Sequence, residues 1–187
     1  MTSQDTSIDF VEWPLNEEGY PYRKAARIVV FNPAGEIFLI LGHDIDDPSQ
    51  TWWFTPGGGI EAEESPADAA VRELREETGL VVDKKRLIGP VLMRYSTFHF
   101  AAKTRKQDEE FFVIHIDESE AELINSGHNR EWTTLEHHLL DDQTWWNLDS
   151  LRAIQDTGQW VFPRDLPEFA REWHGTWDGV CRTIVEE

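Results

Sequence analysis

One stretch of sequence, GGGIEAEESPADAAVRELREETGL at residues 57–80, decides the fold of this chain. Ser65 is a typical N-cap with Asp68 three residues further on, and Pro66 suits the first position of a helix. Gly79 suits the left-handed conformation that ends many helices. The stretch therefore predicts a loop, a helix and a second loop.

The predicted helix has two different faces. The face expected to pack on a core carries Ala67, Ala70, Val71, Leu74 and Thr78. The other face gathers Glu73, Glu76 and Glu77. Repulsion between like charges at such spacings costs roughly 0.2–0.5 kcal/mol per pair, and Arg72 relieves only part of it. A hard cation with oxygen ligands would turn this repulsion into binding energy. The alternative is a solvated, glutamate-rich helix face.

Taken together, these residues resemble the Nudix box. That motif asks for a glycine, five residues, a glutamate, seven residues, Arg-Glu, an aliphatic residue, one residue, Glu-Glu, one residue, a glycine and an aliphatic residue. Every position is satisfied, by Gly58, Glu64, Arg72, Glu73, Leu74, Glu76, Glu77, Gly79 and Leu80. A chance match in a chain of this length is on the order of 10⁻⁷. On this motif the chain is identified as a member of the MutT-like Nudix hydrolases.

The resemblance implies a fold and an activity. Nudix proteins have an α/β (α+β) fold, an α/β/α sandwich around a mixed β-sheet, and the strand-rich context of residues 22–141 is similar to it. We therefore expect a Mg²⁺-dependent pyrophosphohydrolase, with Mn²⁺ as a substitute ion. Its expected reaction is cleavage of the phosphoanhydride bond of a nucleoside diphosphate linked to another moiety, by attack of a metal-activated water at phosphorus.

The resemblance also implies roles for the box residues. Expected metal ligands are the carboxylates of the helix and one backbone carbonyl, from Glu73, Glu76, Glu77 and Gly58. Arg72 would orient the acids, and Glu64 would support them near the metal. A carboxylate must also take the proton of the attacking water, and the choice between Glu76 and Glu77 stays open.

A further acid from outside the box often completes the site in this family. Glu109 and Glu110 stand at the start of a predicted strand, where alternation puts only one of them on the inner face. We favour Glu109 as an additional metal ligand. A charged strand edge that discourages pairing is the alternative for either residue.

Aromatic and basic residues flanking the box are the candidates for base stacking and phosphate contact. The chosen substrate-binding residues are Trp53, Arg94, Tyr95 and Phe98, and further candidates are Trp52, Lys103 and Arg105. Tyr95 lies close to where family members that split dinucleoside polyphosphates carry a tyrosine. No proline stands at that place, which argues against an ADP-ribose pyrophosphatase of the common type.

Composition limits the partners. The chain has 36 acidic and 17 basic residues and a net charge of −19, which opposes binding of long DNA or RNA and leaves a small nucleotide-type substrate. The single cysteine, Cys181, allows no internal disulfide and suits the cytoplasm. No signal peptide or membrane segment is expected, because the N-terminus is polar and the longest apolar runs have four to five residues. A homodimer is a further expectation from the family.

The rest of the sequence predicts one domain over residues 1–187, with an irregular lead-in at 1–22 and a partly helical C-terminal extension at 142–187. The expected strands form hairpins at 27–31 with 36–41 and at 91–100 with 109–116, and a further strand at 51–55 ends at Pro56 and the glycines. Expected helices are 135–140, capped by Thr133 or Thr134, and segments near 148–154 and 169–173, with 160–167 irregular.

Two other functions share this fold. A regulatory Nudix module without catalysis is disfavoured because the box acids are intact. An isopentenyl diphosphate isomerase needs a catalytic cysteine, and the only cysteine here, Cys181, stands close to the C-terminus.

Overall fold

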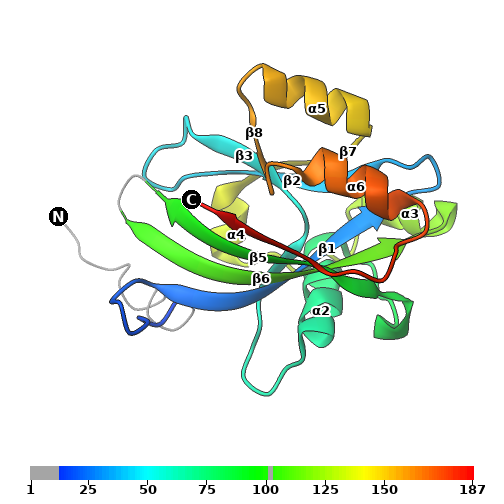
Figure 1. Cartoon of the computed structure of the whole chain (residues 1–187). Helices are drawn as coiled ribbons and strands as arrows, with labels where there is room; N and C mark the ends of the chain where they lie inside the picture. The colour runs from blue at the N-terminus through cyan, green and yellow to red at the C-terminus, as the bar shows by residue number, and fades with distance from the viewer. Residues whose placement is uncertain (1–12, 101–102) are drawn as a thin grey trace.

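A mixed, strongly curved β-sheet runs through the centre of the molecule (Figure 1). The computed structural model describes residues 13–100 and 103–187. In these residues the sheet has nine strands in the order β8-β3-β2-β1-β6-β5-β9, with β4 paired to β1 and β7 paired to β2. The strands are β1 Tyr22–Phe31, β2 Ile37–His43, β3 Thr51–Phe54, β4 Gly57–Gly59, β5 Ile88–His99, β6 Thr104–His115, β7 Leu140–Trp146, β8 Trp160–Phe162 and β9 Arg182–Glu186.

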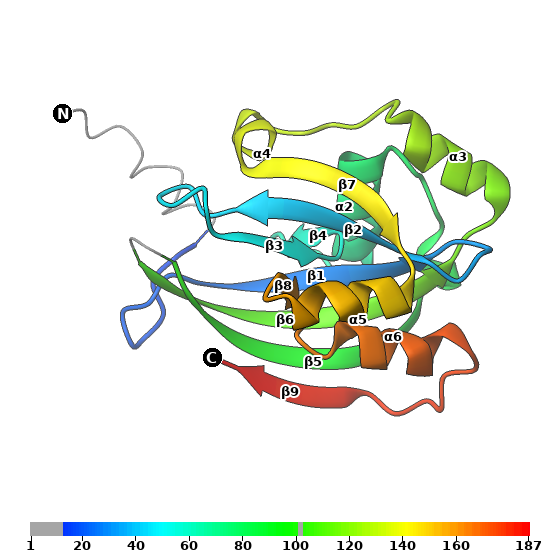
Figure 2. The same ribbon diagram turned by 90° about the horizontal axis from the view of Figure 1, so that it is seen from above.

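Helices cover both faces of this sheet (Figures 1 and 2). Helix α2 (Pro66–Thr78) buries Ala69, Ala70 and Leu74 against one face. Helices α5 (Leu148–Asp156) and α6 (Leu166–His174) pack on the other face, where Leu151 and Trp173 are buried. The arrangement confirms the expected α/β/α sandwich around a mixed sheet. The remaining helical elements are η1 Lys84–Arg86, α3 Glu118–Ser126 and α4 Thr134–Leu139.

Local signals at both ends define α2 as predicted. The Ser65 side chain accepts a hydrogen bond from the Asp68 backbone N–H at 3.2 Å, and Pro66 starts the helix. Gly79 ends it with φ 80°, and its N–H donates to the Arg75 carbonyl. A Cβ at Gly79 would lie 2.2 Å from the His128 carbonyl oxygen, so both the conformation and the space require glycine.

Both predicted hairpins are confirmed. β1 pairs antiparallel with β2, and β5 pairs antiparallel with β6. The third predicted strand is confirmed as β3, and α4 begins after an N-cap at Thr133, one of the two expected residues.

Two local expectations were wrong. The glycines at 57–59 form β4, antiparallel to β1, instead of a loop. Residues 160–167, expected to be irregular, contain β8, which pairs parallel with β3, and the first two residues of α6. The glycines of β4 form a strand through pairing with β1 and not through their own β propensity. Trp160, Val161 and Phe162 do favour a strand by propensity, but a run of three residues is too short to predict one without its partner β3.

The C-terminal part of the chain joins the same sheet. β7 and β8 add to the half that contains β2 and β3, and β9 adds parallel to β5 at the opposite edge. The expected lead-in lies partly outside the described residues, which begin at 13. Among the described residues no helix combines the length and apolar character needed to cross a membrane.

Candidate active site

Helix α2 and strand β4 bring the box residues together on β1. β4 pairs with Ala25–Arg27 of β1, and α2 packs over the same strand. Glu77 is buried, and its carboxylate accepts a hydrogen bond from the Gly57 N–H at 2.8 Å. The Glu73 carboxylate lies directly against Gly58, so close that a Cβ there would stand 2.5 Å from Glu73 Oε1. Strand β4, called the glycine strand, thus lies in contact with Glu73 and Glu77, two of the three acids of α2.

Arg72 holds the carboxylates of Glu64, Glu73 and Glu76 in place. Its guanidinium donates to both carboxylate oxygens of Glu64 at 2.9 Å, to Glu73 at 2.8 Å and to Glu76 at 3.2 Å. Such a planar fork can hold one carboxylate at two points and still contact others, whereas the compact ammonium of lysine cannot form that two-point contact. Arg75 adds a second contact to Glu76 at 3.1 Å.

The electrostatics of the helix acids differ from one residue to the next. Burial raises the pKa of Glu77 well above its ordinary value, and the neighbouring Glu73 carboxylate raises it further. Burial also raises the pKa of Glu73, against the lowering effect of Arg72. The hydrogen bonds from Arg72 lower the pKa of Glu64. Two acids are therefore held close together at an electrostatic cost that a cation would reduce.

The donor set at this place fits a hard divalent cation. It consists of carboxylate oxygens and backbone carbonyls, the ligands that Mg²⁺ prefers. Within residues 13–100 and 103–187, no three acidic, histidine or cysteine side chains already surround a common metal position. Arg72 instead bonds to both Glu73 and Glu76. These two carboxylates would exchange contacts with Arg72 for contacts with an ion, while Glu64 would keep Arg72 in position.

Glu109 lies apart from the helix acids. It is 1% exposed and ion-paired to Arg94 at 2.5 Å and to Arg27 at 2.9 Å. Its side chain is on the face of β6 that carries Phe111, opposite α2. Alternation puts Glu110, the other candidate, on the α2 face together with Phe112. The structure therefore brings Glu110, and not Glu109, to the side of the sheet where α2 lies.

Glu109 and Phe111 also line an aromatic pocket of about 110 Å³. Arg94 and Phe98, two of the predicted substrate-binding residues, line it, as does Trp52. Sequence reasoning missed its other main walls, which are Trp13, Arg23, Arg27, Phe54, Phe100, Gln107 and Phe162. The Thr55 hydroxyl at this pocket is buried and has no hydrogen-bond partner among the described residues. Arg23 and Arg27 are an even number of positions apart on β1, so their side chains point to the same face, and this spacing could have identified both from the sequence.

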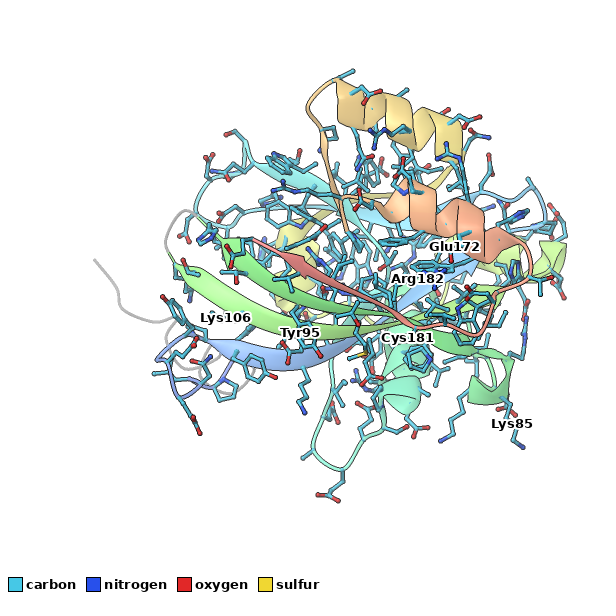
Figure 3. All side chains as sticks on the ribbon, in the orientation of Figure 1. Lys85, Tyr95, Lys106, Glu172, Cys181 and Arg182 are labelled. Atoms are coloured by element: carbon cyan, nitrogen blue, oxygen red, sulfur yellow. The ribbon has the colours of Figure 1, made fainter. Side chains whose placement is uncertain are left out.

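The other two predicted substrate residues lie elsewhere. Trp53 is buried in the core beneath α5 and α6 and packs edge-on against Trp146, with ring centroids 5.2 Å apart. Tyr95 (Figure 3) is 41% exposed on the face of β5 opposite Arg94. It lines a surface pocket together with Tyr22. The structure does not bring either side chain into the aromatic pocket.

The fold and the site together define a class of small α/β/α domain with carboxylates clustered beside a glycine strand. The NUDIX domain model matches residues 21–168, and the chain belongs to the Nudix family. It is a pyrophosphohydrolase that cleaves the phosphoanhydride bond of nucleoside-diphosphate-linked substrates. The family and the phosphoanhydride cleavage expected from the box are confirmed.

Relatives by sequence include an RNA pyrophosphohydrolase of Bartonella bacilliformis, 33% identical over 170 residues that cover 80% of this chain and 88% of that protein. An RNA pyrophosphohydrolase of Brucella abortus is 33% identical over 136 residues, 63% of this chain and 74% of that protein. Two solved structures share the fold at low identity. An ADP-ribose pyrophosphatase from Streptococcus suis has a TM-score of 0.53 and 15% identity, covering 87% of this chain and 98% of that one. A MutT protein from Bacillus halodurans has a TM-score of 0.53 and 16% identity, covering 87% and 89%.

Proposed function

We propose that this enzyme hydrolyses a small nucleoside-diphosphate-linked substrate with Mg²⁺, or Mn²⁺ as a substitute, held by the helix acids and the Gly58 carbonyl. The observation that carries the proposal is the contact of Glu73 with Gly58, where a side chain of any size would displace the carboxylate. The bound ion would neutralise the diphosphate and activate water for in-line attack at phosphorus. The ligands proposed for it are Glu73, Glu76, Glu77 and Gly58.

The protein's own residues position these groups and accept the proton. Arg72 keeps Glu64 in a two-point contact and limits where Glu73 and Glu76 can turn. Glu77 suits a general base because burial raises its pKa. Glu76, which is more exposed, is the alternative base. The choice between them remains a prediction.

The aromatic pocket supports a role in binding the base of the substrate. Phe98 and Phe100 stack at 5.7 Å between ring centroids, and a planar base can extend such a stack. Arg23 joins this pocket to the acids: its Nε donates to Gln107 at 2.7 Å, and its charge lowers the pKa of Glu73. A diphosphate that extends from the pocket to α2 would therefore pass the positive charge of Arg23. Phe98 and Arg94 keep their proposed substrate role, while nothing in the geometry supports one for Trp53 or Tyr95.

For Glu109 the geometry supports a role in holding the pocket walls instead of a metal. Its two oxygens are engaged by Arg27 and Arg94 on the face opposite α2. Glu110 is then the better-placed candidate for an additional acid near the metal, because it lies on the α2 side and burial raises its pKa.

Two observations point to different sizes of substrate. The net charge of −19 favours a small nucleotide over a long chain, whereas the Bartonella and Brucella relatives are named RNA pyrophosphohydrolases. A panel with Mg²⁺ separates the two: ADP-ribose, a dinucleoside tetraphosphate, a nucleoside triphosphate and a 5′-triphosphorylated RNA oligomer. Turnover of at least one of the small compounds, with little cleavage of the oligomer, is expected. Preference for the oligomer would overturn the small-substrate proposal.

We also propose that residues 1–187 act as one domain in the cytoplasm. Support comes from β7, β8 and β9, which complete the sheet begun by β1, and from the exposed, unpaired thiol of Cys181. A homodimer stays a prediction, which light scattering on the purified protein would test.

A further inference from the structure

A chain of ion pairs connects the C-terminal strand to the glycine strand. Glu186 on β9 accepts from Arg94 on β5, with Nε at 2.6 Å and Nη2 at 2.5 Å. Arg94 Nη1 donates to one oxygen of Glu109 at 2.5 Å, and Arg27 Nε donates to the other at 2.9 Å. Arg27 Nη1 then donates to the Gly57 carbonyl at 2.9 Å. We call these four side chains the relay. They lie on β9, β5, β6 and β1, and the last of them, Arg27, contacts β4.

The relay is buried at its centre and partly buried at its two ends. The exposed fractions of its side chains are 14% for Glu186, 3% for Arg94, 1% for Glu109 and 12% for Arg27. Burial raises the pKa of Glu109, but attraction by Arg94 and Arg27 outweighs this, and the net pKa lies below the ordinary value. Two cations and two anions thus balance inside the protein. Removing one charge leaves its neighbours uncompensated, so the others must rearrange.

Rearrangement at Arg27 would reach the active site. Strand β4 has only three residues, and Gly57 is held from two sides, through its carbonyl by Arg27 and through its N–H by the Glu77 carboxylate. Arg27 also donates to the Thr55 carbonyl at 3.2 Å, just before the strand. The position of the next residue, Gly58, therefore depends on the orientation of Arg27.

We propose that Glu186 is a positioning residue for the hydrolase: acting through the relay, it holds the glycine strand against the acids of α2. The inference rests on the proposed role of the Gly58 carbonyl as a metal ligand. Groups that orient metal ligands from behind typically change metal affinity or activity by about 10- to 100-fold when removed. Glu186 would act in this way although it belongs to the last strand of the chain.

A second ion pair on β9 provides a matched control. Arg182, at the start of the strand, pairs with Glu172 of α6 (Figure 3). Both partners are about one-third exposed, and the pair anchors β9 without any contact to the relay. Glu172→Gln therefore removes one charge and one anchor of β9, as Glu186→Gln does, but leaves Arg94, Glu109 and Arg27 paired.

The experiment measures Mn²⁺ binding without substrate by electron paramagnetic resonance, with kcat, KM and melting temperature on the same preparations. Glu186→Gln should weaken Mn²⁺ binding and lower kcat by about tenfold or more, with a smaller change in KM. Glu186→Asp, which keeps the charge on a shorter side chain, should lie between this variant and the wild type. Should Glu186→Gln fail to fold, Glu186→Asp carries the comparison. Glu172→Gln should match the wild type in both Mn²⁺ affinity and kcat.

Two results would overturn the inference. One is wild-type Mn²⁺ affinity and kcat in the folded Glu186 variants, with only the melting temperature lowered, because a purely structural strand anchor predicts that pattern. The other is an equal loss in Glu172→Gln, which would assign the effect to anchoring of β9 in general. A wild-type protein that binds no Mn²⁺ would instead refute the proposed metal site, and the inference with it.

Discussion

Replacing Gly58 by alanine should lower activity without unfolding the protein. The added Cβ would lie 2.5 Å from Glu73 Oε1, whereas ordinary contact begins at 3.4 Å. The carboxylate must therefore retreat by about 0.9 Å, and misplacement of a catalytic group by about 1 Å can lower a rate about 10²-fold. We expect kcat to fall by about that factor when Mg²⁺-dependent hydrolysis of a nucleotide substrate is measured.

The free energy of unfolding should change little in the same variant. Gly58 is not among the glycines with positive φ, so alanine fits its backbone and contributes about 0.4–1 kcal/mol through the unfolded chain. Weakening of the partly exposed Arg72–Glu73 pair costs about 0.2–1 kcal/mol. The two effects nearly cancel, and a residual of about 1 kcal/mol would shift the melting temperature by only about 2–4 °C.

Gly59→Ala is the control for this prediction. Its Cβ would meet nothing closer than Arg23 Nη1 at 3.4 Å, an ordinary contact, and its φ is not positive either. Its kcat should stay within about twofold of the wild-type value, equivalent to about 0.4 kcal/mol in the barrier. Full activity of Gly58→Ala, or equal loss in both variants, would refute the reasoning from the Glu73–Gly58 contact.

Three further predictions concern the same site. Chelation by EDTA should abolish turnover, and undiminished activity in metal-free buffer would exclude the proposed mechanism. Glu77→Gln should cut kcat by at least about 10²-fold, because one of the proposed metal ligands loses its negative charge. Its metal-free melting temperature should hold or rise, since a buried charge with a raised pKa disappears. A destabilised but fully active Glu77→Gln would end its catalytic assignment. Arg72→Lys should lower both kcat and melting temperature, because a lysine cannot keep the two-point contact with Glu64. Wild-type kinetics and melting of this variant would contradict the role of Arg72.

The sequence predicted helix α2 well because its signals are local. Ser65, Pro66 and Gly79 act within one turn of the helix ends, and their geometry is as expected. The spacing of Glu73 and Glu77 likewise places both carboxylates on one side of α2 without reference to the rest of the chain. Here short-range physical chemistry was sufficient.

What the sequence did not predict depends on distant pairing. Strand β4 is three glycines, which have no intrinsic preference for a strand, and it exists because Ala25–Arg27 of β1 supply its hydrogen-bond partners. Strand β9 was likewise absent from the expected elements: Thr183, Ile184 and Val185 favour a strand, but so short a run is recognised only with its partner β5. The aromatic pocket takes walls from β1, β3, β5, β6 and β8, so no single stretch of sequence encodes it.

The placement of Glu109 and Glu110 shows how one strand can serve both sides of this enzyme. Adjacent residues of β6 point to opposite faces, so Glu109 balances two arginines beside the aromatic pocket while Glu110 lies on the side of α2. Sequence reasoning identified the pair but not the face of each, because the inner face is defined by which side α2 packs on. That side follows from the packing of Leu74 with Phe112 and Ile114. An acidic protein can thus pair its arginines on one face of the sheet and gather on the other face carboxylates that Arg72 compensates only in part, which suits the proposed cation.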